Sequence, residues 1–551
     1  MFGTSRAFFM SFGLIGFIIG SPGAALAATL PTGADVVHGQ VELQNPSSDA
    51  MRIIQSSQSA IVNWQSFDIG HGALVDIVQP NIDAAMLSRV VGSNLSEIHG
   101  SLNANGHLYL INPNGILFGS DAQIDVHALI ASSLDIADSA FLSGNISFNG
   151  DSEASVMNLG SIKADEFAAL IGGNVDNSGY ITAPGGNVAL LSGDAVLEVG
   201  EAAGGKITLD LSGLMGGSSS NSGTIDVASA TTKGGGVAIL GDSISVPGSI
   251  DASGETGGGE VLIGGDYQGE NENLSHSQNN LISGTILADA KVEGDGGKVI
   301  VWSDGETDFS GVISAIGGKL GGNGGFVETS GKDIILSGVV STLASNGENG
   351  TYLIDPDDIE INTTLSSAGS SNGYSLITPT TIDTSLSGGN LVISTATTTG
   401  DGVTTDGGDL VIKAPITNSS GNALTLTAVD HIRSSGSGTV NITGDLNLNA
   451  GNGGITVGTT LQSGGTLTTN SVGAQSFTKN VTANALNFTT TQDGNGVVMS
   501  KYQGGTVTAD LENGGLDLEA TSGNITVATI DVSGTDGTAD VTLISSGSIL
   551  D

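Results

Sequence analysis

The sequence of 551 residues contains no cysteine and few cationic residues. The missing cysteine excludes disulfide bonds, thiolate metal sites and a cysteine nucleophile. Lys and Arg together number 14 against 56 Asp and Glu, which gives a formal net charge of -42 at pH 7. A chain of this charge repels nucleic acid phosphates and anionic lipid headgroups, so we expect no nucleic acid partner.

Proline and aromatic residues are also scarce, at 10 residues and 4% of the chain, whereas glycine numbers 87. Glycine and proline together stay below the roughly 25–30% that marks non-periodic disordered chains. Hydrophobic residues make up 38% of the sequence, which is enough to bury a sizeable core. A folded chain with this composition is expected to repeat one small unit.

Long apolar runs are missing after the N-terminus. Residues 1–27 carry one cation, Arg6, then an apolar run over residues 7–20 and the small-residue pattern Ala25-Leu26-Ala27. This pattern predicts a secretory signal peptide that is cleaved between Ala27 and Ala28. The run is shorter than the about 20 residues of a membrane-spanning helix, and an uncleaved anchor is the alternative interpretation. We therefore expect an exported, soluble and acidic protein.

From about residue 150 onward, two short phrases alternate along the chain. The first is Gly-x-Ile, and the second is a glycine pair followed by an apolar strand. Their apolar residues are Ile162, Ile181, Ile225, Ile250, Ile286 and Ile313 for the first phrase, and Val188, Val237, Val261, Val299 and Val327 for the second. The intervening segments are too polar and glycine-rich for crossover helices. The pattern favours an elongated, all-β parallel solenoid over a string of β-sandwiches.

Asparagine occurs just before several of these phrases, at Asn158, Asn177 and Asn221. On a solenoid, such side chains stack into a ladder whose amides hydrogen-bond from coil to coil. From about Leu353 the composition shifts to Thr, Asn and Ser with short apolar alternations. This shift predicts a second run of solenoid coils rather than a linker.

The densest motif covers residues 106–119, with the sequence GHLYLINPNGILFG. At its centre, Asn112, Pro113, Asn114 and Gly115 satisfy the dihedral requirements of a type I β-turn, with proline second and glycine fourth. On these residues alone, the motif is a good connection between two apolar strands.

The segments before this motif carry a family resemblance. They are NWQSFDIG at residues 63–70, LSRV at residues 87–90 and IHGSLNANG at residues 98–106. In this order they resemble the secretion domain of the filamentous haemagglutinin family, the exported partners of two-partner secretion. The resemblance is strong over residues 30–197, continues more weakly at residues 299–305 and 324–331, and at residues 352–358 is similar to the high-molecular-weight adhesin branch.

This resemblance implies a right-handed parallel β-helix that leaves the periplasm through a dedicated outer-membrane β-barrel transporter with periplasmic binding domains. It matches Asn112, Pro113, Asn114 and Gly115 residue for residue to the family's secretion motif, whereas Ser88 stands where the family usually has Asn. The expected organisation is a signal peptide at residues 1–27, a two-partner secretion domain at 28–200, glycine-rich β-helix repeats at 201–350 and a Thr/Asn/Ser-rich β-solenoid continuation at 351–551.

Patterns for catalysis and metal binding are weak. The seven histidines show no H-E-x-x-H or paired metal spacing, and no serine lies in a G-x-S-x-G elbow. The acidic residues Asp355, Asp357, Asp358 and Glu360 lack the spacing of a calcium loop. We expect them to form a solvated turn, with a calcium site as the alternative. We therefore expect no enzyme activity, no cofactor and no bound metal.

Together these features predict an adhesin that is secreted, or retained at the outer-membrane surface of a Gram-negative bacterium, and that binds a receptor on host cells or other bacteria. A cytolysin or a contact-dependent toxin carrier is the alternative, because related secretion domains precede both. A toxin would show a compact, helix-capable domain, whereas about the last hundred residues remain strand-patterned. A polysaccharide-acting enzyme is the more distant alternative, because such enzymes also use parallel β-helices.

Overall fold

The computed structural model describes residues 29–550 except for short internal stretches. Those stretches are residues 145, 151, 194–196, 203–205, 211–215, 272–273, 275, 365–373, 396–407, 492–495, 512–515, 521–524 and 532–540. The predicted signal peptide and its cleavage site at Ala27 and Ala28 lie outside the described residues. None of the helices in the described part is both long and apolar enough to span a bilayer.

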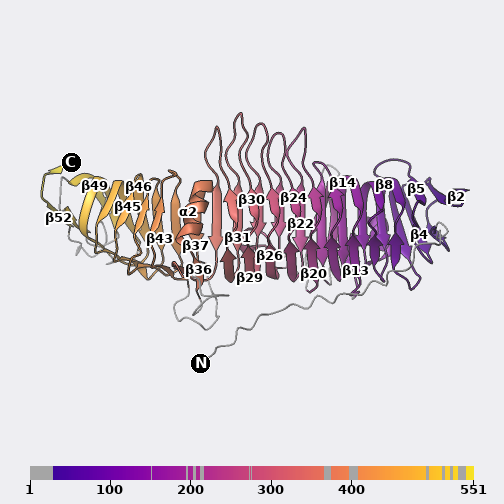
Figure 1. Ribbon diagram of the computed structural model, residues 1–551, viewed down its shortest axis with the longest axis horizontal. Coiled ribbons are helices and arrows are strands. Elements are labelled where there is room, and N and C mark those ends of the chain that lie inside the picture. Colours follow the sequence, from indigo (N-terminus) through magenta and orange to yellow (C-terminus); the bar gives the residue numbers. More distant parts are fainter. Residues whose placement is uncertain are drawn as a thin grey trace, which may run out of the picture.

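Short parallel strands coil into an elongated β-helix (Figure 1). One coil consists of β23 (Ser243–Val246), β24 (Ser249–Asp251) and β25 (Glu260–Ile263), and the next of β26 (Ser277–Ile282), β27 (Thr285–Leu287) and β28 (Lys298–Val301). Each strand pairs in parallel with its counterpart one coil further on. Backbone hydrogen bonds are thus satisfied between coils. The predicted elongated, all-β parallel β-helix is confirmed.

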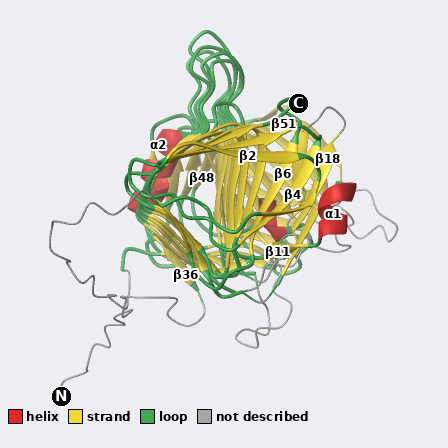
Figure 2. Cartoon of the chain, turned by 90° about the vertical axis from the view of Figure 1, so that its right-hand side faces the viewer, coloured by secondary structure: helices red, strands yellow, loops and turns green. Residues whose placement is uncertain are grey.

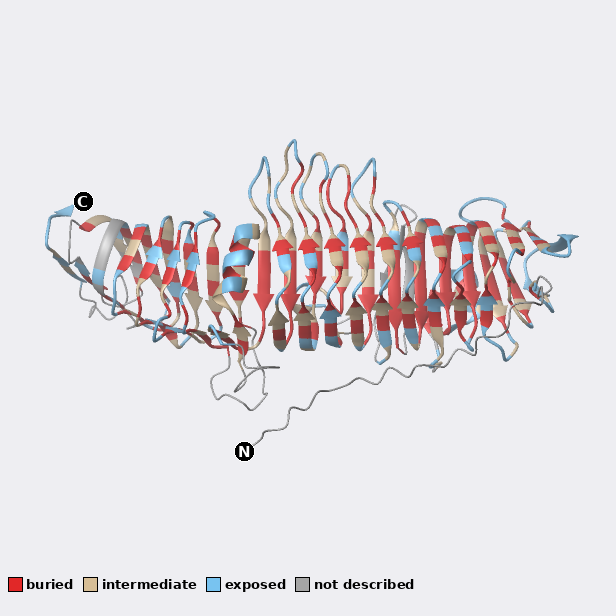
Figure 3. Cartoon of the chain, viewed as in Figure 1, coloured by how far each residue is buried: buried red, intermediate tan, exposed pale blue. Residues whose placement is uncertain are grey.

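Each of the two repeated phrases forms a column of stacked side chains. The first column runs coil by coil through Ile162, Ile181, Ile225, Ile250, Ile286 and Ile313. The second runs through Val188, Val237, Val261, Val299 and Val327. All of these side chains are buried, so the columns make a continuous apolar core along the β-helix (Figure 3).

Glycines precede the isoleucine column because adjacent coils approach too closely there for a side chain. A Cβ on Gly248 would lie 2.2 Å from the carbonyl oxygen of Gly223, and a Cβ on Gly284 would lie 1.9 Å from that of Gly248. Only glycine allows backbone to approach backbone this closely. The Gly-x-Ile phrase therefore combines a close contact between coils with a buried anchor.

The predicted asparagine ladder is present in the coils that contain Asn158, Asn177 and Asn221. Nδ2 of Asn158 donates to Oδ1 of Asn177 at 2.8 Å, and Nδ2 of Asn177 donates to Oδ1 of Asn221 at 2.7 Å. All three side chains are fully buried. Because a buried amide without a partner is costly, each asparagine depends on its neighbours in the adjacent coils.

Insertions leave the coils without disturbing the columns. A loop projects between β21 (Thr224–Asp226) and β22 (Gly236–Leu240), and equivalent loops project from the following coils (Figures 1 and 2). Isolated parallel bridges between neighbouring loops join Ser229 to Gly254, Gly254 to Ala290 and Glu293 to Gly321. The side loops therefore stack on one another as the coils do.

Antiparallel strands cover the first coils. β1 (Asp35–His38) pairs with β4 (Ser59–Trp64), and β2 (Val41–Ser47) pairs with β3 (Ala50–Gln55). Nearly all residues of β1 and β2 are exposed, whereas β4 is largely buried. The two exposed strands thus cover the edge of the first parallel coil.

A small second layer lies outside the coils near this end. It consists of α1 (Asp138–Ser143), β11 (Asp135–Ile136), β12 (Ile146–Asn149), β18 (Leu197–Ala202) and β19 (Lys206–Asp210). Its four strands form an antiparallel sheet. The layer packs on the outer side of the coils through a separate apolar cluster that includes Tyr109, Ile130, Phe141, Phe148 and Ile171.

The coils continue through the Thr/Asn/Ser-rich part of the chain, where Leu424, Leu446, Leu467 and Leu486 form one buried column. Near the start of this part, helix α2 (Pro379–Gly388) packs against β33 (Val339–Ser341) and β39 (Ile416–Asn418). The repeats do not predict this helix. Its start does carry a helix signal, because the Thr378 hydroxyl accepts from the Thr381 N–H and proline follows Thr378.

Candidate functional site

The predicted secretion motif forms a turn at a corner of the β-helix. Residues 112–115 connect β8 (Ser101–Ile111) in the largest sheet to β9 (Ile116–Phe118) in the nine-stranded sheet. The Gly115 N–H donates to the carbonyl of Asn112 at 2.9 Å. This is the hydrogen bond of a β-turn, so the turn expected from the sequence is present.

Asn112 is fully buried and holds the turn against the segment before it. Its Nδ2 donates to the carbonyl of Asn94 and to Oγ of Ser96, both at 2.9 Å. Its Oδ1 accepts from the backbone N–H of Asn114 at 2.9 Å and from Nδ2 of Asn114 at 3.0 Å. Because the amide uses both donors and its oxygen internally, Asn112 shapes the turn.

Gly115 is required by both its conformation and its surroundings. Its φ of 103° lies in the region that favours glycine. A Cβ at this position would lie 2.8 Å from the carbonyl oxygen of Ser155 and 3.1 Å from Cδ1 of Leu95. The Gly115 carbonyl also accepts from the Ser96 N–H at 3.1 Å. Gly115 and Asn112 thus fix the turn to the same preceding segment.

Pro113 and Asn114 are the exposed half of the motif. Nδ2 of Asn114 also donates to the carbonyl of Gly92 at 2.9 Å, and the Pro113 carbonyl accepts from Oγ of Ser152 at 2.8 Å. These contacts hold both residues in place. Oδ1 of Asn114 has no hydrogen-bond partner among the described residues. The turn therefore presents a proline ring and an oriented amide oxygen on a rigid support.

Arg89 fastens the outer layer to the coil beside this turn. Its guanidinium donates to Asp135 at 2.8 Å and to Asp138 at 2.7 Å, and it also donates to the carbonyl of Ile136. Burial by itself lowers the pKa of Arg89, but the two carboxylates outweigh it and the pKa is raised. The neighbouring Ser88 is fully buried in the coil. The LSRV segment thus has a structural part in joining two layers.

The family comparison identifies the region that contains the turn. A family model described as the TPS secretion domain matches residues 27–299. The chain thus contains a TPS secretion domain. The turn, its support and the Arg89 contacts all lie within the residues that this model matches. The TPS secretion domain is part of a two-partner secreted protein, and its family is not an enzyme family.

Curated relatives of the TPS secretion domain are much longer proteins. The chain is 36% identical over 182 residues to a heme/hemopexin-binding protein of Haemophilus influenzae, covering 31% of this chain and 20% of that protein. It is 42% identical over 116 residues to another Haemophilus influenzae heme/hemopexin-binding protein, covering 21% of this chain and 12% of that protein. The chain thus spans a fifth or less of these relatives.

Two solved structures are also similar to the chain. The HMW1 secretion domain from Haemophilus influenzae has a TM-score of 0.46 and 20% identity, covering 95% of this chain and 100% of that chain. A filamentous hemagglutinin secretion domain has a TM-score of 0.28 and 15% identity, covering 59% of this chain and 99% of that chain.

Beyond the TPS secretion domain, the acidic run at residues 355–360 is not a solvated turn, so this prediction is wrong. Asp355 and Asp358 are only 4% and 3% exposed. Oδ1 of Asp358 accepts two backbone N–H bonds, at 3.0 and 2.8 Å, and Glu360 pairs with Lys413. Among the described residues, these carboxylates have separate partners and do not converge on a calcium site.

A buried carboxylate that the repeats do not predict lies beside Asp355. Glu328, on β31 (Phe326–Ser330), is fully buried. Gln268 bridges the two acids, since its N–H donates to Glu328 at 3.2 Å and its Nε2 donates to Asp355 at 3.0 Å. Burial raises the pKa of Glu328 to about 8, although hydrogen bonds from Ser330 and Gln268 oppose the shift. The loop that covers Glu328 comes from another coil, so no local pattern reveals it.

Proposed function

We propose that the protein is recognised in the periplasm by an outer-membrane β-barrel transporter with periplasmic binding domains, and that the exposed side of the Asn112–Gly115 turn is part of the recognised surface. The observation that carries this proposal is the division within the motif. Asn112 and Gly115 build the turn, and Pro113 and Asn114 face solvent. A rigid, preorganised surface binds a partner without an ordering cost.

The chemistry of the chain supports export through a narrow pore. A chain without cysteine has no covalent loop that would obstruct threading. Coils that contact only their neighbours can fold one after another as they emerge. We propose that this sequential folding outside the cell biases the direction of transport. The proposed organisation keeps a signal peptide at residues 1–27, a two-partner secretion domain at 28–200, and further coils at 201–350 and 351–551.

Asn114→Ala tests the recognition proposal, because Asn114 is exposed and its loss leaves Asn112 in place. Asn81→Ala is the matched control, since Asn81 is also exposed and its Nδ2, like that of Asn114, donates to a side-chain amide oxygen, here Oε1 of Gln58 at 3.0 Å. Both variants are expressed with the transporter, and the ratio of protein in the culture supernatant to protein in the periplasm is measured. We expect Asn114→Ala to accumulate in the periplasm and Asn81→Ala to be released normally.

Normal release of both Asn114→Ala and Pro113→Ala would contradict the recognition proposal and leave the motif with only its structural role as a β-turn. Thermal midpoints of the purified full-length variants show whether a release defect reflects misfolding. Asn112→Ala does not separate the two roles, because it removes buried hydrogen bonds as well as the motif. N-terminal sequencing of the released protein also tests the signal peptide, for which we propose a mature start at Ala28.

We further propose that the released β-helix is an adhesin, secreted or retained at the outer-membrane surface of a Gram-negative bacterium. Its length and its stacked side loops offer an extended surface to a receptor on host cells or other bacteria (Figure 1). The alternative is the N-terminal part of a cytolysin or contact-dependent toxin carrier. The names of the two curated relatives favour a second candidate, binding of heme or hemopexin.

Binding of the purified protein to cells, to hemin and to hemopexin separates these candidates. An adhesin is expected to bind cells saturably without binding hemin or hemopexin. Saturable hemopexin binding without cell binding would replace the adhesin proposal by the second candidate. Lysis or killing of target cells would instead support the toxin alternative.

A further inference from the structure

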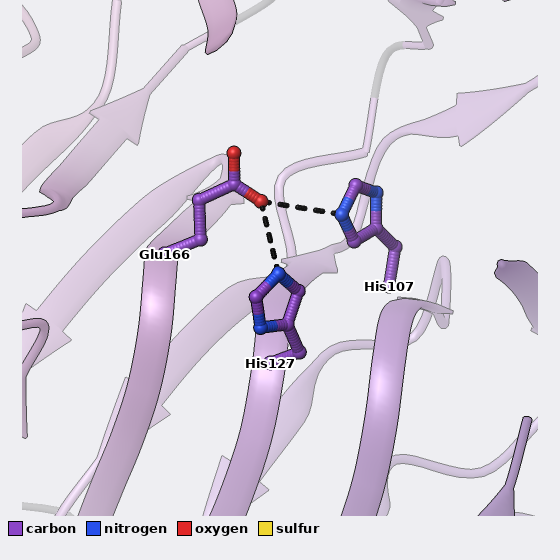
Figure 4. Close-up of side chains that lie close together, drawn as sticks. All are labelled: His107, His127 and Glu166. Atoms are coloured by element: carbon purple, nitrogen blue, oxygen red, sulfur yellow. Dashed lines mark ion pairs between the residues drawn. The ribbon is translucent and has the colours of Figure 1, made fainter. Parts of the chain in front are cut away.

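Three side chains from successive coils meet at one corner of the TPS secretion domain (Figure 4). They are His107 on β8, His127 on β10 (Gln123–Ser132) and Glu166 on β14 (Ser161–Gly172). At His127, β10 shifts register against both of its neighbours. Such irregularities redirect side chains out of the regular pleat. The corner thus collects two imidazoles and a carboxylate from three coils.

The spacing of these groups is that of metal ligands. Nε2 of His107 lies 3.3 Å, and Nε2 of His127 3.4 Å, from the same Oε2 of Glu166. Both separations exceed the roughly 2.7–3.2 Å of an ordinary N–H···O hydrogen bond. Tetrahedral zinc, with bonds of about 2.0–2.1 Å, holds its ligand atoms about 3.3–3.5 Å apart. The three ligand atoms all lie within 4.8 Å of one another.

The surroundings orient the histidines and leave them accessible. The two rings stack with centroids 5.7 Å apart and planes 12° apart. Both Nε2 atoms face the carboxylate of Glu166 (Figure 4). The side chains of His107, His127 and Glu166 are 16%, 17% and 29% exposed, which lets an ion reach them. Nδ1 of His127 faces the carboxylate of Asp165 at 3.8 Å, as metal-bound histidines commonly face a carboxylate.

A second cluster, Asp409, Asp430 and His431, lacks this character. The guanidinium of Arg433 already pairs with Asp409. Nδ1 of His431 lies 3.2 Å from Asp430 and 4.0 Å from Asp409. This cluster therefore offers one imidazole beside a carboxylate that already has a cation, and it is the weaker candidate.

We propose that His107, His127 and Glu166 bind a divalent transition-metal ion, for which zinc is the best fit, across three successive coils. Two imidazoles and one carboxylate are zinc ligands, and water completes the tetrahedron. Because the ligands come together only in the folded coils, the ion binds the folded chain and links those coils. The site has no paired spacing in the sequence because its histidines are one coil apart.

Titration of the untagged chain without residues 1–27 tests the site directly. After treatment with a chelator, the protein is titrated with zinc chloride near pH 7.5 by calorimetry. We expect one zinc ion per chain and a thermal midpoint that rises with zinc and falls again with EDTA. At free zinc about 100-fold above the dissociation constant, the ratio of folded to unfolded coils should rise about 100-fold. A wild-type chain that binds no zinc overturns the proposal.

Single substitutions test which side chains bind the ion. His127→Gln and Glu166→Gln should each weaken zinc binding at least tenfold, and cobalt at the wild-type site should give the visible absorption of a four-coordinate ion. His71→Gln is the control, because His71 also contacts a carboxylate, Asp121 at 3.0 Å, but belongs to no three-ligand cluster in the described residues. Thermal midpoints without metal verify folding, and His107→Gln replaces any variant that fails to fold. Unchanged zinc affinity in these variants, or its loss only in His431→Gln, overturns the assignment.

Discussion

The part of the β-helix before about residue 350 (the first half) and the part after it (the second half) share one construction, including close glycine approaches such as those at Gly248 and Gly451, and differ in the asparagine ladders that join their coils. In the first half, the ladder consists of the buried amides of Asn158, Asn177 and Asn221. In the second half, the ladder of Asn449 and Asn470 is more exposed. Nδ2 of Asn470 donates to Oδ1 of Asn449 at 2.9 Å. Nδ2 of Asn449 in turn donates to Oγ1 of Thr427 at 3.3 Å.

The two halves also differ in their connections. The second-half leucine column recurs every 19–22 residues, from Leu424 through Leu446 and Leu467 to Leu486. The first-half valine column is interrupted by side loops and, between Val188 and Val237, also by the outer-layer strands β18 and β19, so these two valines are aligned although 49 positions apart. Alignment survives in both halves because the buried apolar residues and the parallel ladder set the register. The inner columns therefore define the fold, whereas the connections between strands are free to vary in length.

The largest effect should come from filling the close glycine approach. Gly248→Ala places a Cβ 2.2 Å from the Gly223 carbonyl, whereas a Cβ on Gly458 in the second half meets nothing nearer than the Ser434 carbonyl at 3.3 Å. We expect Gly248→Ala to lower the free energy of unfolding by about 4 kcal/mol, because overpacking and lost hydrogen bonds between coils add. Gly458→Ala should cost less than about 1 kcal/mol. Chemical denaturation measures both, and equal losses would contradict the role of the close approach at Gly248.

The next largest effect concerns the buried carboxylate of Glu328. Glu328 has a pKa of about 8 when folded and an ordinary value of 4.5, so the folded state holds more protons between these values. Stability should therefore fall as the pH rises through this window, by about 3 kcal/mol between pH 5 and 7.5. Glu328→Gln should flatten this slope in a series of thermal midpoints. A wild-type slope that persists in the variant would assign the titration to another group.

Glu360, where the second half begins, provides the opposite sign. Burial by itself raises its pKa, but hydrogen bonds from Lys413 and Asn362 outweigh burial and lower it. This contribution to stability is present above the unfolded pKa and is lost as the pH falls through the folded pKa. Glu360→Gln should therefore reduce sensitivity to acid, while Glu328→Gln reduces sensitivity to base.

The smallest effect should separate the two kinds of asparagine ladder. Asn177→Ala removes one hydrogen bond from the buried Nδ2 of Asn158 and one from the buried Oδ1 of Asn221, which should cost about 2 kcal/mol. Asn449→Ala removes contacts in a more exposed ladder, where water replaces them, and should cost less than about 1 kcal/mol. Hydrogen exchange of the flanking coils measures both changes. A larger loss at Asn449 would reverse the interpretation of the two halves.

The sequence was sufficient for the coil and for the turn, because both depend on local patterns. Gly-x-Ile and the glycine-pair phrase predict strands of period two, and their recurrence predicts the two columns that the structure contains. The turn at residues 112–115 follows from its asparagine, proline and glycine positions. The roles of Pro113 and Asn114 in secretion, and the domain boundaries at residues 200 and 350, stay predictions.

Features whose partners lie in neighbouring coils could not be predicted from local sequence patterns. Asp355 was expected in a solvated turn, yet the loop carrying Gln268 covers it. Helix α2 was missed because the repeats around it predict strands, although Thr378 and Pro379 form a helix start. In each case, the deciding partner lies tens of residues away in the sequence.

Residue types and their recurrence were enough to predict a cysteine-free, acidic stack of short strands, separated by glycines, with apolar columns inside. These properties are written in residue type and periodicity, which act locally. The stacking of the coils, in contrast, makes Asn112 buried and Asn114 exposed, brings Glu328 beside Asp355, and places His107 and His127 against Glu166. Insertions of unequal length separate the coils, so the residue above each side chain is known only once the coils are stacked.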